Sequence, residues 1–233
     1  MFFDKFFKKK AIDKRKDNPL IICIHGFGRR RDDEFIPLVE ALKDEYEFVI
    51  PLLYDQRHIT DNVWHTWVSR AEEEIIKAKK DNREIILIGF SMGGVIASYL
   101  ASRFNVKKLI LLAPAFEYFV KQAKEKVKSM VVKEEPKPID KYVDLPQEFY
   151  PTFMDIVENC KLGIEKIDCP VFMMAAIGDE VISYKTCLKY YEKVPHDNKK
   201  CQIFADGQHD LLADERLSKL VINNIQAFIE DKI

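Results

Sequence analysis

Ser91 is the residue whose neighbours point most directly to chemistry, because it stands in the segment Gly89-Phe90-Ser91-Met92-Gly93. The apolar run Ile85–Phe90 precedes it, and apolar residues suited to a helix follow it. A serine at a sharp turn from strand to helix exposes its hydroxyl, and glycines two residues before and after it let the strand and the helix approach each other. We therefore predict that Ser91 is a nucleophile; a tight glycine turn with an incidental serine is the alternative.

Two later residues could activate such a serine. Asp179 follows the apolar run Val171–Ile177, and His209 follows the short run Gln202–Ala205. A histidine can take the proton of a serine hydroxyl, and a carboxylate can hold the imidazole in the required tautomer. We predict His209 as the general base and Asp179 as the residue that orients it, with Glu180 as the competing carboxylate.

The segment His25-Gly26-Phe27-Gly28 ends the first apolar run and predicts part of an oxyanion site. Its glycines allow the loop backbone to approach the nucleophile, so the backbone N–H groups of Phe27 and Met92 are the predicted donors to a developing oxyanion. The Met92 N–H would also lie at the start of a helix, where the helix dipole favours negative charge. His25 precedes the nucleophile in the chain, and we expect it to order the loop rather than to act as a base.

These residues need strands whose ends meet at one edge of a sheet. Short apolar, β-branched runs alternate with longer segments of helical period, which is the pattern of buried parallel strands and covering helices. The predicted fold class is α/β, with an open, mostly parallel sheet of six or seven strands and helices on both faces. The predicted strands are Leu20–Ile24, Phe48–Pro51, Ile85–Phe90, Lys108–Ala113, Val171–Ile177 and Gln202–Ala205, and the predicted helices span residues 34–44, 61–80, 93–104, 183–193 and 215–230.

One domain over residues 20–233 is the predicted organisation, since a chain of 233 residues is long enough for a single large core. Residues 116–166 contain no convincing core strand, and we expect them to form a cap or lid over the site rather than an elaborated surface crossover. Residues 1–19 form an aromatic and basic N-terminal arm. We expect its phenylalanines to pack on the domain; contact with a membrane surface is the alternative.

Charge and cysteine content narrow the class of partner. The 37 lysine and arginine residues nearly balance the 38 aspartate and glutamate residues, so the chain lacks the basic field of a nucleic-acid-binding protein and favours a small-molecule partner. The five cysteines are scattered without metal-ligand spacing, and we expect reduced thiols in a cytoplasmic protein. No apolar run approaches the roughly 20 residues of a membrane span, and no secretory signal is expected.

The chain order Ser91, Asp179, His209 and the segment Gly89–Gly94 resemble the α/β-hydrolase superfamily. Within it, the chain is similar to small bacterial carboxylesterases and to the monoacylglycerol lipase or lysophospholipase group. The resemblance covers nearly the whole chain from Leu20 onward, and it implies ester hydrolysis through an acyl-enzyme on Ser91 with no metal or organic cofactor. The two antiparallel strands that open the superfamily's sheet have no clear counterpart in residues 1–19.

Aromatic residues near the predicted site suggest an apolar pocket for the acyl group of a small or lipid-like ester. The candidates are Trp64, Phe90, Phe116 and Phe119, and ordinary core packing is the alternative for each of them. The same triad serves several acyl-transfer reactions, so a thioesterase, an amidase and a peptidase are alternative functions. A non-catalytic binding protein with the same fold is a further alternative.

Overall fold

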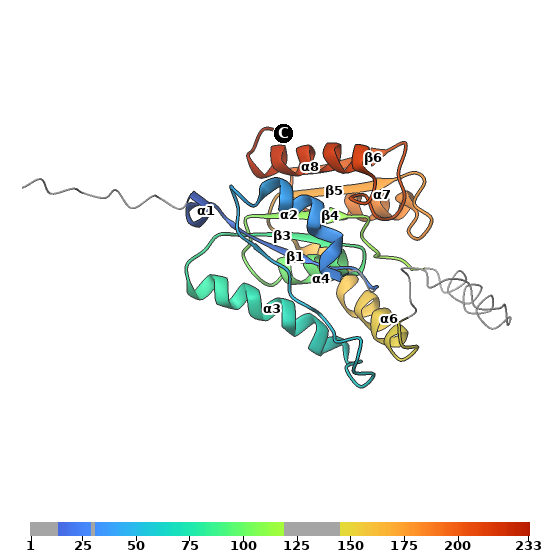
Figure 1. The fold of residues 1–233 in the computed structure, drawn as a ribbon. Coiled ribbons are helices and arrows are strands. Elements are labelled where there is room, and N and C mark those ends of the chain that lie inside the picture. The colour runs from blue at the N-terminus through green and yellow to red at the C-terminus, as the bar shows by residue number, and fades with distance from the viewer. Residues whose placement is uncertain (1–13, 29–30, 119–144) are drawn as a thin grey trace, which may run out of the picture.

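A six-stranded parallel sheet forms the centre of the molecule, with the strand order β2-β1-β3-β4-β5-β6 (Figure 1). The computed structural model describes residues 14–28, 31–118 and 145–233. The strands are β1 (Leu20–Ile24), β2 (Phe48–Val49), β3 (Ile85–Phe90), β4 (Lys108–Leu112), β5 (Val171–Ala176) and β6 (Lys199–Phe204). Because all six strands are parallel, their carboxyl ends meet at one edge of the sheet.

The alternation of side-chain direction along each strand explains why helices cover both faces of the sheet. In β1, Ile22 and Ile24 belong to one buried cluster, whereas Ile21 and Cys23 belong to the other. Successive side chains of a strand point to opposite faces, so a strand that is apolar at every position requires cover on both sides. The continuous apolar runs in the sequence are therefore the signature of central strands.

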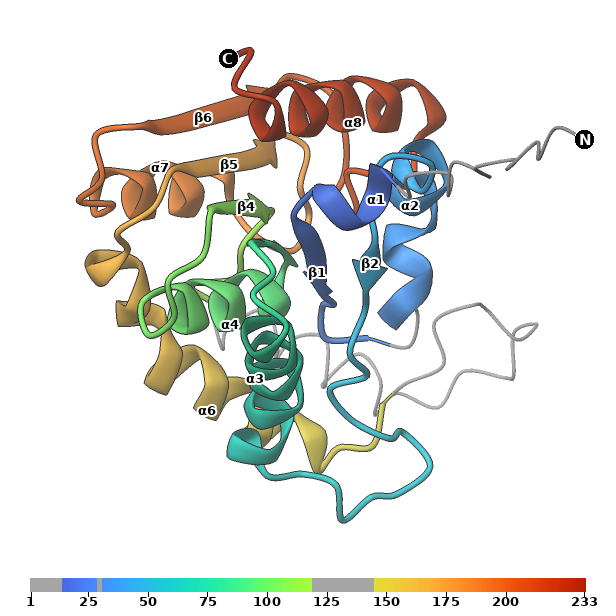
Figure 2. The same ribbon diagram turned by 90° about the vertical axis from the view of Figure 1, so that its left-hand side faces the viewer.

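Two groups of helices provide this cover (Figure 2). Helices α2 and α8 contribute to the core on one face, and helices α3, α4, α6 and α7 contribute to the core on the other. The helical elements are α1 (Lys14–Asp17), η1 (Arg31–Phe35), α2 (Ile36–Leu42), α3 (Trp64–Lys80), α4 (Met92–Ala101), α6 (Phe149–Cys160), η2 (Lys161–Lys166), α7 (Tyr184–Glu192) and α8 (Glu215–Ile229), where η denotes a 3₁₀ helix. The predicted α/β fold class, with six strands in one sheet, is confirmed.

Most predicted boundaries differ from the observed ones by one to three residues, and two elements show the physical reason. Strand β6 begins at Lys199, three residues before the predicted start at Gln202, because an edge strand tolerates polar side chains and its apolar signal is weak. The predicted helix 34–44 is divided into η1 and α2, and Pro37 lies in the first turn of α2. Proline fits that position because the first turn of a helix needs no N–H donor there.

Helix α6 lies within the predicted cap region and was not among the predicted helices. Its residues Phe149, Phe153 and Ile156 are buried in the same cluster as α3 and α4. This part of the cap region therefore packs as a regular layer on the helices that cover the sheet. Residues 119–144 of the predicted cap and residues 1–13 of the predicted arm lie outside the described residues.

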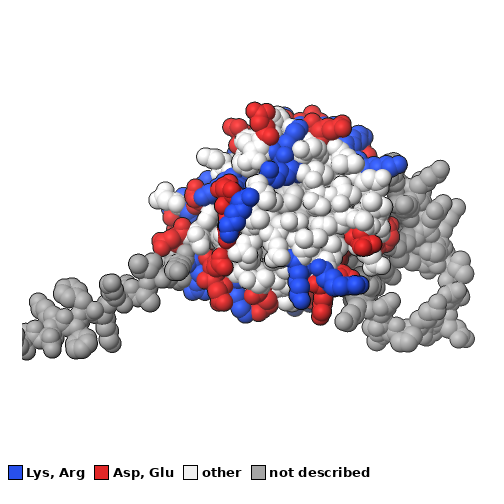
Figure 3. All heavy atoms as spheres, turned by 90° about the horizontal axis from the view of Figure 1, so that it is seen from above, with Lys and Arg blue, Asp and Glu red and all other residues white. Residues whose placement is uncertain are grey.

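The surface carries both signs of charge. On the face shown in Figure 3, acidic and basic side chains lie interspersed around a largely uncharged area. This mixture agrees with the formal net charge of −1. No helix among the described residues is both long enough and apolar enough to cross a bilayer.

A buried lysine links the centre of the sheet to the end of α8. Lys108, the first residue of β4, is 3% exposed, and its Nζ donates to the carbonyl oxygens of Phe228 and Ile229 and to Asp231 Oδ1. The last carbonyls of a helix lack the N–H partners of its interior. The Phe228 carbonyl oxygen also accepts backbone N–H groups of the C-terminal turn, whereas Lys108 is the donor to the Ile229 carbonyl oxygen. Its ammonium group also lowers the pKa of Asp231.

We predict that the substitution Lys108→Met lowers the free energy of unfolding by about 2 kcal/mol, because it leaves the carbonyl oxygen of the buried residue Ile229 without its lysine donor. Urea denaturation followed by circular dichroism measures this change. The matched control is Lys107→Met, which removes an exposed ion pair with Glu84 and should cost about 1 kcal/mol or less. Equal losses in the two variants would show that Lys108 is not a capping group.

Candidate active site

Ser91 joins β3 to α4 with the backbone angles φ 52° and ψ −118°. A positive φ is uncommon for any residue other than glycine and persists only where the surroundings hold it. The Ser91 N–H donates to the Leu112 carbonyl oxygen at 2.9 Å, and the Ser91 carbonyl oxygen accepts from the N–H groups of Gly94 at 3.0 Å and Ala115 at 3.1 Å. The neighbouring strand β4, the loop after it and α4 thus hold the bend.

The glycines beside Ser91 are required by close backbone approach. A Cβ atom on Gly93 would lie 1.9 Å from the Ile24 carbonyl oxygen, and a Cβ atom on Gly89 would lie 2.4 Å from the Gly93 carbonyl oxygen. No side chain fits at such distances. The small size of these residues therefore lets α4 begin directly against β1 and β3, which is the role that the sequence pattern predicted for them.

The imidazole of His209 lies between Ser91 and Asp179. Its Nε2 is 2.9 Å from Ser91 Oγ, and its Nδ1 is 2.9 Å from Asp179 Oδ2. Ser91 follows β3, Asp179 follows β5 and His209 follows β6, so the three side chains come from the carboxyl ends of different strands. The structure thus brings together the three residues that the sequence singled out.

Asp179, rather than Glu180, is the carboxylate that contacts the imidazole. The Asp179 side chain is fully buried, and its second oxygen accepts the backbone N–H groups of Val181 at 2.8 Å and Ile182 at 2.7 Å. Glu180 instead accepts the backbone N–H of His209 at 3.2 Å. The carboxylate of Asp179 is therefore held rigidly, whereas Glu180 supports the loop that carries the histidine.

Two backbone N–H groups near Ser91, those of Phe27 and Met92, have no protein partner among the described residues. The loop that holds Phe27 lies beside Ser91 because Ile24 pairs with Gly89 in the sheet. Met92 is the first residue of α4, and a helix leaves the N–H groups of its first turn without partners. Both groups are therefore available to an oxyanion.

His25 is buried, and both of its ring nitrogens are engaged. Its Nε2 accepts the Leu53 N–H at 3.0 Å, so Nδ1 carries the proton and donates to the Gly26 carbonyl oxygen at 2.8 Å. His25 thus orders the loop. Two residues that the sequence did not single out, Glu34 and Tyr54, also hydrogen-bond to this loop. They reach it from separate segments, so no spacing in the sequence marks them.

The predicted pocket residues lie in different surroundings. The Phe90 ring is 7% exposed and packs against His209, with ring centroids 5.0 Å apart. Trp64 begins α3, is half-buried and stacks on His65 at 3.5 Å. Phe119 lies outside the described residues.

A cavity of about 340 Å³ lies between the segment that follows β4, α6 and α7. Phe116 is part of its wall and stacks on Tyr190 with ring centroids 4.4 Å apart. Tyr118, Met154 and Val157 add further apolar surface, and the charged residues Glu117, Glu158, Lys161 and Lys189 complete the lining. Of the predicted pocket residues that the structure describes, Phe116 lines this cavity, whereas Trp64 and Phe90 do not.

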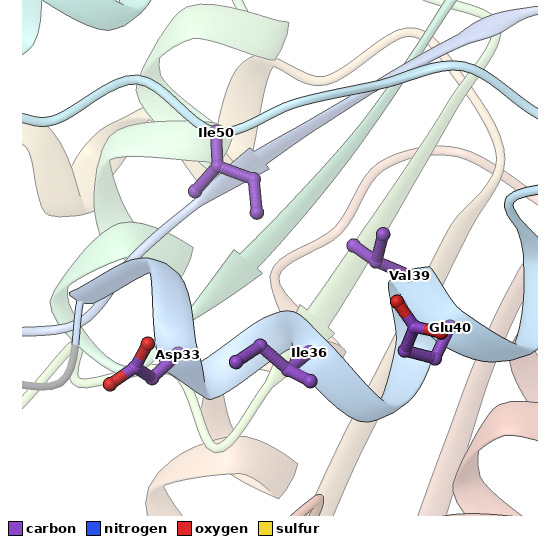
Figure 4. A pocket seen from close by; sticks show the side chains of 5 residues that line it. All are labelled: Asp33, Ile36, Val39, Glu40 and Ile50. Atoms are coloured by element: carbon purple, nitrogen blue, oxygen red, sulfur yellow. The ribbon is translucent and has the colours of Figure 1, made fainter.

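A smaller hollow of about 160 Å³ lies away from these residues (Figure 4). It is formed by Asp33, Ile36, Val39, Glu40 and Ile50, from η1, α2 and the segment after β2. Within residues 14–28, 31–118 and 145–233, no group of three or more histidine, cysteine, aspartate or glutamate side chains is arranged to hold a metal ion.

Comparisons with known proteins agree with the fold described above. Residues 19–154 match the model of the family described as alpha/beta hydrolase fold. A Mycoplasma pneumoniae protein provisionally named esterase/lipase 3 is 27% identical over 260 residues, which cover 89% of this chain and 92% of that protein.

Two solved structures share the fold. A structure of the metagenome-derived lipolytic enzymes LipS and LipT has a TM-score of 0.73 at 15% identity, covering 91% of this chain and 93% of that chain. The monoacylglycerol lipase of Paleococcus ferrophilus has a TM-score of 0.69 at 15% identity, covering 91% of this chain and 95% of that chain.

We predict that Gly93→Ala lowers the free energy of unfolding by about 3 kcal/mol or more, since β1 and α4 would have to separate. For a domain of this size, such a loss lowers Tm by about 6–12 °C. Gly28→Ala is the matched control, because a Cβ atom there meets nothing within 4 Å. Thermal unfolding of both variants measures the difference, and a normal Tm for Gly93→Ala would contradict the close approach.

Proposed function

This chain belongs to the α/β hydrolase fold family, and from that membership we propose that it cleaves carboxylic esters with Ser91 as nucleophile, His209 as base and Asp179 as the orienting acid. The likeness to an esterase/lipase over 89% of the chain supports ester hydrolysis. One observation carries the proposal above all others: the His209 imidazole contacts Ser91 Oγ and Asp179 Oδ2, both at 2.9 Å.

The hydrogen-bond pattern assigns the resting tautomer of His209. A carboxylate only accepts hydrogen bonds, so the contact with Asp179 requires the proton on Nδ1. The opposite nitrogen, Nε2, then has a lone pair directed at the Ser91 hydroxyl. In this state His209 can take the serine proton, and Asp179 stabilises the imidazolium that forms.

In the proposed reaction, Ser91 Oγ attacks the carbonyl carbon of the ester while its proton passes to His209 Nε2. The carbonyl oxygen becomes an oxyanion that accepts hydrogen bonds from the Phe27 and Met92 amides. One such donor contributes roughly a hundred- to thousandfold in rate in enzymes of this kind. The N-terminal end of α4 also stabilises the negative charge of the oxyanion through the helix dipole.

The tetrahedral intermediate collapses when His209 returns the proton to the leaving alcohol oxygen. The acyl group is then bound to Ser91 as an ester. Water, deprotonated by His209, attacks this ester and forms a second oxyanion. The bond from the acyl carbon to Ser91 Oγ then breaks, His209 returns the proton to Ser91 Oγ, and the carboxylic acid is released. No metal or organic cofactor takes part in the proposed cycle.

Aromatic rings next to Phe27 offer an apolar surface to an acyl group. The Phe27 ring stacks on Phe153 of α6 with centroids 5.0 Å apart, and Phe153 contacts Tyr118 at 5.1 Å. Tyr118 and Phe116 both line the 340 Å³ cavity. We propose that the acyl group of a small or lipid-like ester lies along this aromatic surface, with Phe116 as part of the pocket.

We predict that Asp179→Asn lowers kcat by about four orders of magnitude, because an amide can no longer hold the required tautomer. Steady-state hydrolysis of a p-nitrophenyl ester measures the loss. Glu180→Gln should cost less than about fivefold, since its contact with the His209 backbone is exposed to solvent. A larger loss in Glu180→Gln than in Asp179→Asn would reverse the two assignments.

The substrate class is tested by hydrolysis of p-nitrophenyl esters from C2 to C16, monoacylglycerols, lysophospholipids and acyl-CoA thioesters, with Ser91→Ala as the blank. We expect ester hydrolysis in the wild type and about a millionfold lower kcat in Ser91→Ala, the order of loss when a serine triad loses its nucleophile. A sharp preference for the thioesters would replace the ester assignment by a thioesterase. Full activity of a folded Ser91→Ala variant would refute the proposed nucleophile.

A further inference from the structure

The three backbone N–H groups of the loop 26–28 differ in whether they donate to a protein group. The Gly26 N–H donates to Glu34 Oε2 at 2.8 Å, and the Gly28 N–H donates to Tyr54 Oη at 2.8 Å. The Phe27 N–H, between them, donates to no group among the described residues. Two side chains therefore occupy the outer amides of the loop and leave the middle amide for a ligand.

Tyr54 holds the Gly28 side of the loop. Its hydroxyl accepts the Gly28 N–H and donates to the Gly28 carbonyl oxygen at 2.7 Å. The residue is 1% exposed, and its ring packs against Trp67 with centroids 4.3 Å apart and against Phe149 at 5.5 Å. Because α3 and α6 fix the ring, the hydroxyl is a rigid anchor for both polar groups of Gly28.

Glu34 holds the Gly26 side of the loop. It lies in η1 and is 7% exposed, so its hydrogen bond to the Gly26 N–H is shielded from water. The carbonyl oxygen of Gly26 accepts a hydrogen bond from His25 Nδ1 at 2.8 Å. The peptide groups on either side of Phe27 are thus fixed before any substrate arrives.

We propose that Tyr54 and Glu34 are positioning residues that set the direction of the Phe27 N–H toward the oxyanion. This inference rests on the proposed function, because it assigns the Phe27 N–H to the oxyanion of an ester. Neither side chain has to touch the substrate. Their contribution is to keep one amide aligned with the charge that develops in the transition state.

The effect is expected in kcat rather than in KM. An amide aimed at the oxyanion stabilises the transition state more than the ground state, and a misplacement of about 1 Å can cost about a hundredfold in rate. A variant that loses the hydrogen bond of either Tyr54 or Glu34 keeps the other one, so the Phe27 amide should move less than if both were lost. We therefore expect about a tenfold loss of kcat for each anchor, with KM within about twofold.

The first test compares Tyr54→Phe with Tyr46→Phe. Tyr54→Phe keeps the aromatic packing and removes the hydroxyl that binds Gly28, so kcat should fall about tenfold. Tyr46 is a buried tyrosine in the cluster on the opposite face of the sheet, and its loss of a hydroxyl should leave kcat unchanged. The value of kcat is calculated with the concentration of folded protein, which is determined from an unfolding curve for each variant.

The second test uses Glu34→Gln and Glu34→Leu. Glutamine keeps an oxygen that can accept the Gly26 N–H, whereas leucine does not, so the glutamine variant should recover most of the kcat that the leucine variant loses. This pair keeps the inference testable if either tyrosine variant fails to fold. Equal kcat values for the two Glu34 variants would overturn the role of Glu34.

A trifluoromethyl ketone provides a readout that a purely structural role would not change. Ser91 Oγ bonds to its carbonyl carbon, the carbonyl π bond becomes an oxyanion, and the serine proton moves to His209. Its inhibition constant should rise about tenfold in Tyr54→Phe and in Glu34→Leu, in parallel with kcat/KM. It should stay constant in Tyr46→Phe.

The outcomes separate this inference from the proposed function. If the wild type hydrolyses esters, Ser91→Ala does not, and Tyr54→Phe retains the wild-type kcat and inhibition constant, the positioning role is wrong and the proposed function stands. If the wild type neither hydrolyses esters nor binds the ketone, the proposed function fails. A rise in KM with unchanged kcat would make Tyr54 a substrate-binding residue and overturn the inference.

Discussion

Ser91 adopts φ 52° and ψ −118° between the last residue of β3 and the first residue of α4. Such a conformation costs a non-glycine residue on the order of 1–3 kcal/mol, so the rest of the fold has to hold it. Leu112, Gly94 and Ala115 bind the backbone of Ser91, and Gly93 allows α4 to start against β1. One bend therefore exposes the Ser91 hydroxyl and places the Met92 amide at the beginning of a helix.

The parallel sheet explains how distant segments meet at this bend. The loops after β1, β3, β5 and β6 carry Phe27, Ser91, Asp179 and His209, and all of them leave the same edge of the sheet. The chain runs to one side of β1 through β2 and to the other side through β3, so β1 and β3 form the point at which the strand order reverses. Open α/β sheets bind ligands at such a point, because the loops diverge there. Ser91 and the loop that carries Phe27 lie at the ends of these two strands.

The sequence predicted the parts of the fold that depend on local pattern. Strands β1 and β3 were predicted to the residue, because they are buried on both faces and their apolar runs are continuous. Ser91, Asp179 and His209 were singled out because each follows an apolar run, and strand ends are where a parallel sheet places its functional loops. Helix α6 was not predicted, because its apolar face is accounted for by packing on α4 and not by contact with a strand next to it in the sequence. Tyr54 and Glu34 were missed for a related reason: their partners are backbone atoms of a loop 26 and 8 residues away, which no residue pattern encodes.

The central claim is that Ser91, activated by His209, is the nucleophile of an ester hydrolase. Its most direct test is reaction of the native protein with a fluorophosphonate, followed by mass spectrometry of the digested chain. We expect one modified residue, Ser91, with labelling abolished in Ser91→Ala and greatly slowed in His209→Ala. Modification of a different residue, or no modification of folded wild-type protein, would contradict it.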